Sequence, residues 1–314
     1  MKRISYTLLF LFLIAFVSKS NAQVDSVYVR SFERPLSVRI YTQSKILNLD
    51  YEYGEDKEKS FVSNTPLNIG FGLGWKKTMI SGSITISQLR DKSKGRTTSF
   101  DFQYRYYGQK LIGDIIIQRY KGLYNDNPPH LIYPNLRVNR YGLAGHYIFN
   151  NKKFSYSAVF DNTALQRNSA GSFHLGGMAL YTKVNADSAF LFKDDYKQKN
   201  IQFGISGGYA YTWVWKRNYY LTGSLSVGVN LGIDDIPGLH NKKIGVYPSL
   251  YSRIATGYNA KAWTLSLSAF IFGSELYRRG DDKLNLMSAD IQLTYVRRFS
   301  MKSSFLDKIT GNRK

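Results

Sequence analysis

Apolar and polar residues alternate with a period of two along most of the chain. The stretch from Thr97 to Tyr107 is the clearest example, because aromatic residues occupy positions 100, 102, 104 and 106, while Ser, Asp, Gln and Arg occupy positions 99, 101, 103 and 105. The same alternation recurs in residues 67–75, 201–215, 219–231 and 287–295. It predicts strands that have one apolar and one polar face.

The length of these stretches favours strands that cross a membrane. They span roughly 10 to 14 residues, whereas strands of soluble domains usually have about 5 or 6, and a tilted membrane-crossing strand needs about 9 to 11. We therefore predict an all-β fold, an antiparallel transmembrane β-barrel of the outer-membrane type, with lipid outside and polar groups inside. A soluble, lectin-like sandwich is an alternative, but long strands with aromatic ends argue against it.

Thirteen stretches carry the strand pattern, whereas a bacterial single-chain barrel has an even number of strands. We expect about 12 strands, with 14 as the alternative. One stretch between Phe154 and Lys199, or else the first stretch, is then misassigned. The stretches are residues 36–52, 67–76, 78–88, 97–107, 111–121, 137–149, 153–163, 172–184, 200–215, 218–232, 244–258, 261–273 and 286–299.

The first stretch shows a change of pattern. Its apolar residues stand at even positions at the start (Val38, Ile40) and at odd positions later (Leu47, Leu49). Because neighbouring positions of a strand face opposite sides, this change predicts a bulge or a break.

Short connections alternate with longer ones, and aromatic residues cluster beside the short ones. Trp213, Trp215 and Tyr219 flank one short connection, and Tyr258 and Trp263 flank another. Outer-membrane barrels have short periplasmic turns and aromatic girdles at the membrane interfaces, so we expect the short connections at the periplasmic end.

The N-terminus has the three parts of a secretory signal peptide. Lys2 and Arg3 supply positive charge, residues 4–17 are mostly apolar, and Ser20 and Ala22 mark a small-residue cleavage site. The alternative, a membrane anchor, needs about 20 apolar residues, more than this run provides. We expect export through a cleaved signal peptide to the outer membrane of a Gram-negative bacterium, with the chain divided into a signal peptide (1–22), an N-terminal periplasmic segment (23–35), a β-barrel (36–299) and a basic C-terminal tail (300–314).

Composition and charge limit the kinds of partner that the chain can bind. The chain has no cysteine, so we expect no lipid anchor on cysteine, no disulfide and no thiolate metal site. The formal net charge is +21, and removal of the three cations of the signal peptide leaves +18. For an exported basic chain we expect no nucleic acid but outer-membrane lipid, including lipopolysaccharide, as a partner, and the barrel-assembly machinery for insertion.

Polar residues on inward faces are the candidates for chemistry. A hydrolase would need a nucleophile, a base and an orienting group within reach of one another. Ser172 lies near His174 in sequence, but the sequence does not fix their geometry. Acidic pairs at 194–195, 234–235 and 281–282 lack the spacing of an EF-hand loop, so we predict no metal and no cofactor. The predicted polar network of the lumen comprises Asp101, Arg105, Asp114, Arg140, His146, Asp161, His174, Arg253 and Asp290.

Several segments resemble a family of exported bacterial proteins described as domain of unknown function 4421. These are Ser169 to Phe173 with Leu175 to Gly177, Tyr120 to Tyr124, and Gly208 to Tyr211. The resemblance covers about Leu36 to Phe299 and implies a Gram-negative outer-membrane barrel without an assigned activity, so it carries over no functional residues.

Two hypotheses about function remain open. The first is a binding or transport barrel, that is, a small channel, a lipid-handling protein or a structural surface protein. The alternative is an outer-membrane enzyme that acts on lipid or lipopolysaccharide. The small residues Ser169, Ala170, Gly171 and Ser172 lie where the strand pattern fails, and we expect this segment to fold inward as a plug or constriction.

Overall fold

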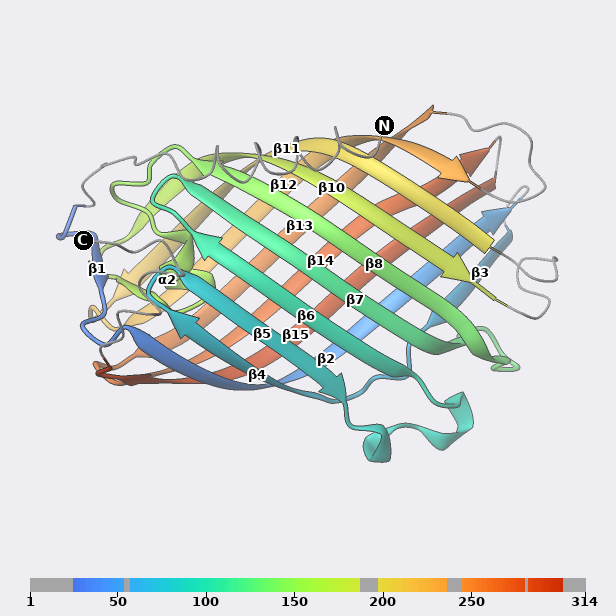
Figure 1. The fold of residues 1–314 in the computed structure, drawn as a ribbon, viewed down its shortest axis with the longest axis horizontal. Coiled ribbons are helices and arrows are strands. Elements are labelled where there is room, and N and C mark those ends of the chain that lie inside the picture. Colours follow the sequence, from blue (N-terminus) through green and yellow to red (C-terminus); the bar gives the residue numbers. More distant parts are fainter. Residues whose placement is uncertain (1–24, 54–56, 187–196, 236–243, 280–281, 302–314) are drawn as a thin grey trace, which may run out of the picture.

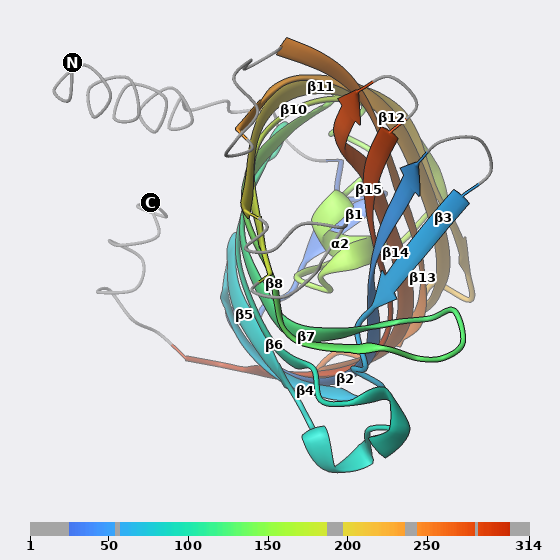
Figure 2. The ribbon, with the colours of Figure 1, turned by 90° about the vertical axis from the view of Figure 1, so that its right-hand side faces the viewer.

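The computed structural model describes residues 25–53, 57–186, 197–235, 244–279 and 282–301; the expected signal peptide and nearly all of the basic tail lie outside them. Thirteen antiparallel strands form one sheet that closes on itself where the last strand pairs with the first (Figures 1 and 2). The strands are β2 (Leu36–Tyr53), β3 (Lys57–Val62), β4 (Asn68–Trp75), β5 (Thr78–Thr85), β6 (Thr98–Tyr107), β7 (Leu111–Asn125), β8 (Ile132–Ile148), β10 (Ala170–Asn185), β11 (Lys197–Trp215), β12 (Tyr219–Asp235), β13 (Ile244–Asn259), β14 (Trp263–Arg279) and β15 (Asp282–Phe299).

The ring has twelve strand positions, because β3 and β4 lie one after the other beside β2 and occupy the same position. β3 pairs with residues 48–53 of β2, and β4 pairs with residues 36–43 of the same strand. The predicted strand at 153–163 is wrong. These residues contain the short helix α2 (Tyr156–Phe160), and they are not part of the wall.

The bulge or break predicted in the first strand is not found in β2. The neighbouring position of the ring is interrupted instead, between β3 and β4. β2 pairs with β15 over its whole length without a register shift, and its odd-numbered residues face inward throughout. Leu47 and Leu49 are buried inside the barrel, so the change in pattern reports a change from a polar to an apolar interior. The interruption falls at residues 63–67, between β3 and β4.

The wall is narrower at one end. β5 ends at Thr85 and β6 begins at Thr98. Beyond these residues β3 pairs directly with β7, Phe61 with Asn125 and Val62 with Tyr124. The ring therefore has two strands fewer there. The connection between β5 and β6 carries the 3-10 helices η1 (Ser87–Leu89) and η2 (Lys92–Lys94).

The outer surface of the barrel is apolar and the inner surface is largely polar. On β11, Ile201 and Phe203 are 45% and 63% exposed, while Gln202 between them is 1% exposed and faces inward. Near the short turns, aromatic rings touch in a chain across five strands on the outside. The contacts join Trp215 with Tyr219, Tyr219 with Tyr258, Tyr258 with Trp263 and Trp263 with Tyr295, at centroid distances of 4.9 to 6.3 Å.

The inward face of β11 tolerates little added volume. A Cβ on Gly204 would lie 1.6 Å from Asn230 Oδ1, whereas a Cβ on Gly207 would meet no atom within 4 Å. We expect Gly204→Ala to lower the free energy of unfolding by about 1–3 kcal/mol, because Asn230 must move and lose its hydrogen bond to Gln202.

Denaturant unfolding in detergent micelles measures this cost, with Gly207→Ala as the matched control on the same strand. Equal stabilities of the two variants would contradict the packing described for Asn230.

Candidate functional site

A segment between β8 and β10 closes the short-turn end of the barrel from within. Figure 2 shows its helix α2 inside the ring of strands. The helix begins after Ser155, whose Oγ accepts a hydrogen bond from the Ala158 amide, as expected for an N-cap. Its buried residues pack on a cluster that includes Met79, Ile112 and Tyr220 of the wall. We call residues 149–169 the plug; its strand β9 (Ala164–Gln166) pairs with β1 (Val29–Ser31).

Two consecutive residues attach the plug to the wall. Asp161, which is 0% exposed, accepts hydrogen bonds at Oδ1 from Arg39 (3.0 Å) and Arg105 (2.8 Å). Asn162 accepts at Oδ1 from the Tyr220 hydroxyl (2.9 Å) and at its backbone oxygen from Arg298 (2.7 Å). These partners come from β2, β6, β12 and β15, so the plug is held from several sides.

Asp161 remains a carboxylate despite its burial. Burial by itself raises the pKa of Asp161, but the guanidinium groups of Arg105 and Arg39 outweigh it, and the pKa is lowered below its ordinary value. The contact with the wall is therefore one buried carboxylate whose Oδ1 is shared by two guanidinium groups.

An apolar layer fills the opposite end of the interior. Inward side chains from β2, β3, β7, β8, β10, β14 and β15 meet there in one buried cluster. Its members are Leu47, Leu49, Phe61, Tyr120, Leu123, Leu136, Val138, Val184, Ala186, Leu276, Leu284 and Leu286.

At the same end, polar side chains of β11 form hydrogen bonds across the lumen to the backbone of β14; we call these hydrogen bonds the seam. Asn200 Nδ2 of β11 donates to the backbone oxygen of Leu276 (2.9 Å), and Gln202 Nε2 donates to that of Glu275 (2.7 Å). β14 has a register shift against β15 between Glu275 and Tyr277. Because β12 and β13 separate β11 from β14 in the wall, these hydrogen bonds tie two distant parts of the ring together.

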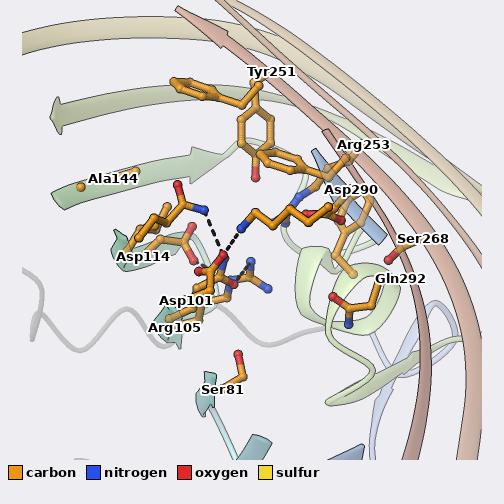
Figure 3. Close-up of a pocket in the computed structure, with 18 of the residues that line it drawn as sticks. Ser81, Asp101, Arg105, Asp114, Ala144, Tyr251, Arg253, Ser268, Asp290 and Gln292 are labelled. Atoms are coloured by element: carbon orange, nitrogen blue, oxygen red, sulfur yellow. Dashed lines mark hydrogen bonds and ion pairs between the residues drawn. The ribbon is translucent and has the colours of Figure 1, made fainter. Parts of the chain in front are cut away.

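Between the plug and the apolar layer lies a charged chamber, with a cavity of about 120 Å³ (Figure 3). Lys45 forms an ion pair with Asp101, which also accepts a hydrogen bond from Gln118 (3.1 Å). Arg105 Nε lies 3.0 Å from Asp114. These pairs, together with Asp161, neutralise most of the buried charge.

Two guanidinium groups of the chamber have no such partner. Arg140 is 5% exposed, its Nη2 is buried without a hydrogen bond, and its charge lies 4.8 Å from the ring centroid of Phe272. Arg253 lies between aromatic rings, 5.2 Å from Tyr251 and 5.4 Å from Phe160, and forms no ion pair with a described residue. Asp290 also lines the chamber without an ion pair within the described ranges.

The chamber therefore holds one positive charge in excess. Its cations are Arg39, Lys45, Arg105, Arg140 and Arg253, and its anions are Asp101, Asp114, Asp161 and Asp290. Because an uncompensated buried charge is costly, the chamber favours an anion beside the unpaired guanidinium groups.

The nine residues predicted for the polar network lie inside the barrel. Eight are on wall strands and Asp161 is on the plug. His146 and His174 are neighbours, with ring centroids 6.0 Å apart. His174 contacts the hydroxyl of Ser226 through Nε2 (2.6 Å), whereas Ser172 Oγ accepts from the Asn150 amide (2.9 Å), so the serine beside His174 in space is not the one beside it in sequence.

Sequence reasoning missed several residues of the chamber and its anchors, chiefly Arg39, Lys45, Asn162 and Arg298. Arg39 and Lys45 occupy odd positions of the first strand, the same parity as Leu47 and Leu49. If all odd positions from 37 onward are taken to face inward, both residues are identified. The bulge predicted in this strand led to a different assignment. Nothing in the local sequence marks Asn162.

The small segment at 169–172 is not the part that folds inward. Ala170, Gly171 and Ser172 belong to wall strand β10, and Ser169 Oγ accepts from the Val214 amide (2.9 Å). The plug that precedes this segment in sequence enters the barrel instead, because Ala170 already pairs with Thr212 of β11.

Within the described residues, no helix is long and apolar enough to cross a membrane, and no group of three His, Cys, Asp or Glu side chains is placed to hold a metal ion.

Comparison with known proteins identifies the family. The model of the family described as "Domain of unknown function (DUF4421)" matches residues 23–299. The chain belongs to this family. The resemblance seen in the sequence is thereby confirmed. No curated protein matches the DUF4421 chain.

Solved structures with some similarity are outer-membrane proteins. The COG4313 outer membrane channel from Pseudomonas putida F1 has 10% identity and a TM-score of 0.42, over 86% of this chain and 97% of that one. A bacterial polysaccharide outer membrane secretin has 9% identity and a TM-score of 0.40, over 85% and 99%. The outer-membrane OmpT of Vibrio cholerae has 6% identity and a TM-score of 0.35, over 83% and 98%. These low scores leave the function to be argued from the residues of this chain.

The Asp161 carboxylate is expected to be a main support of the plug. Asp161→Ala leaves Arg39 and Arg105 without their buried partner and should lower the free energy of unfolding by about 3–5 kcal/mol. Denaturant unfolding in micelles at neutral pH measures it, and Asp91→Ala, in the exposed η2 connection, is the control. A cost as small as that of the control would show that the plug is held by other contacts.

The same carboxylate gives a pH dependence. Because the folded pKa of Asp161 is lowered, its stabilisation is complete above the ordinary pKa of about 4 and is lost as the pH falls through the folded value. Unfolding series at decreasing pH should show a steeper loss for the wild type than for Asp161→Asn. Parallel curves for the two proteins would refute this assignment.

Proposed function

We propose that this DUF4421 protein resides in the outer membrane of a Gram-negative bacterium. Its exposed apolar belt, its polar interior and the aromatic chain near the short turns support this location. β2 begins and β15 ends at the short-turn end, which we assign to the periplasm. The plug then lies on the periplasmic side and the apolar layer on the outer side.

Within that membrane, we propose a transport barrel that binds a small anion in an occluded chamber. The observation that carries this proposal is the Arg140 guanidinium, which lines the cavity between the plug and the apolar layer and has no acceptor among the described residues. A permanently open pore would not need seals at both ends of its lumen. An enzyme acting on lipid would need its reactive groups at the lipid surface, whereas the contact between His174 and Ser226 faces the lumen.

The size of the chamber limits what it accepts. A cavity of about 120 Å³ has room for several water molecules or a small anion, but not for a sugar acid. Passage requires both the plug and the apolar layer to open. The plug needs the smaller change because it is a single connection, which Asp161 and Asn162 anchor to the wall.

Anion binding is tested by stability at constant ionic strength. We expect inorganic phosphate, exchanged against the larger gluconate, to raise the free energy of unfolding, by about 2.7 kcal/mol at a concentration one hundred times Kd. Arg140→Gln should abolish this dependence because it removes the unpaired charge. Arg297→Gln, the same change on the outward face of β15, should retain it.

Transport is tested with the same variants in vesicles. Phosphate uptake by the wild type should exceed that by Arg140→Gln, and Arg297→Gln should match the wild type. Stability that is indifferent to phosphate, in a protein shown to be folded, would overturn the anion chamber and leave a structural barrel.

A further inference from the structure

Six cations lie in two adjacent rows on the outer surface of four neighbouring strands. They project from β7, β8, β10 and β11 near the end opposite the short turns, on positions whose parity faces outward. The first row contains Arg119, Lys183 and Lys199, and the second contains Lys121, Arg137 and Lys197. We call these six residues the cation rows.

The strand register sets like charges directly against each other. Lys183 is paired with Lys199 across β10 and β11, and Lys121 is paired with Arg137 across β7 and β8. Like charges in directly opposed positions destabilise a sheet. None of the six forms an ion pair with a described residue; Asp235, the register partner of Lys199, is the nearest acidic position along the first row. Among the described residues, Asp235 is thus the one acidic residue set against these six cations, and the arrangement favours the binding of further anions.

The rows lie at the edge of the apolar belt. Two residues below the first row on the same strands, Tyr141 and Tyr181 stack with centroids 6.0 Å apart, and Ile117 and Ile201 flank them. The Arg119 guanidinium lies 5.9 Å from the Tyr141 ring centroid. Tyrosines mark the membrane interface, and two residues of a strand rise about 7 Å. The cations thus stand at the level of lipid headgroups.

The other side of the barrel differs at this height. On the outward face of the β2 and β15 pair, Asp50 lies opposite Asn285 and Glu52 lies opposite Lys283, with Lys283 Nζ 3.3 Å from Glu52. On this pair an acidic residue therefore faces a basic one, whereas in the cation rows basic residues face each other.

From this geometry we infer that the cation rows bind the phosphate groups of a phosphorylated glycolipid in the outer leaflet. The inference rests on the proposed orientation, in which the end opposite the short turns faces the cell exterior. Arginine forms paired hydrogen bonds with phosphate, and lysine adds point charges. Two rows of cations fit a headgroup that carries more than one phosphate, and its acyl chains would lie against the apolar surface below.

The test uses the full-length mature protein in detergent, with bisphosphorylated lipid A as the probe and native mass spectrometry as the readout. We expect the triple variant Arg137→Gln, Lys183→Gln, Lys199→Gln to bind at least tenfold more weakly than the wild type. The matched control is Lys77→Gln, Lys152→Gln, Lys261→Gln, which removes three exposed cations at the short-turn end and should change affinity less than twofold.

Three outcomes would overturn the site: equal losses in both triple variants, equal binding of dephosphorylated lipid, or full competition by inorganic phosphate at the same concentration as the lipid. The last outcome would identify free phosphate as the ligand. Arg140→Gln should bind lipid A normally, so a failure of the anion chamber is distinguishable from a failure of this site.

A second measurement compares thermal stability without and with lipid. In lipid-free detergent, Lys183→Gln should raise the unfolding temperature because it relieves the repulsion from Lys199. Added lipid A should reverse the order, stabilising the wild type more than the variant. A lower unfolding temperature for Lys183→Gln without lipid would contradict the uncompensated repulsion on which the inference depends.

Discussion

The pairing of β15 with β2 is the contact on which the rest of the structure depends. It joins the two ends of the sheet over the full length of both strands, so no edge strand is left along this seam. A closed ring keeps backbone amides and carbonyls paired without water, which is the condition for apolar side chains to cover its outside. Closure also creates an interior, and every polar side chain that points inward must find a partner there.

The inward side chains are arranged in three layers along the barrel. Next to the short turns, the plug supplies apolar side chains and the two anchoring residues Asp161 and Asn162. At the other end, leucines and a seam of amide side chains meet across a wall that has lost two strands. Between them the charges pair with one another, apart from Arg140, Arg253 and Asp290.

The outer surface shows a related imbalance. Cations oppose one another across β7, β8, β10 and β11 without forming an ion pair within the described chain, whereas on β2 and β15 Glu52 forms one with Lys283. In both places the protein carries positive charge that its described residues do not fully neutralise. An anion in the chamber and a phosphate group at the cation rows would each compensate an excess of positive charge. The first site lies in the lumen and the second on the outer surface.

The sequence by itself determined the barrel, the inward and outward faces of most strands, and the nine polar residues of the lumen. Alternation is a local property of a strand, and it survives in any arrangement that keeps one face in lipid. It also led to two errors, since the plug at 153–163 carries a strand-like pattern and the apolar interior at Leu47 looked like a bulge.

Only the tertiary structure decided which charges are paired, which segment enters the lumen, and that β3 and β4 share one position. These depend on contacts between residues far apart in the chain, such as Arg39 with Asp161, which are separated by 122 residues. A periodic pattern specifies the face on which a side chain lies, but the partner it meets across the lumen is fixed only when the ring closes.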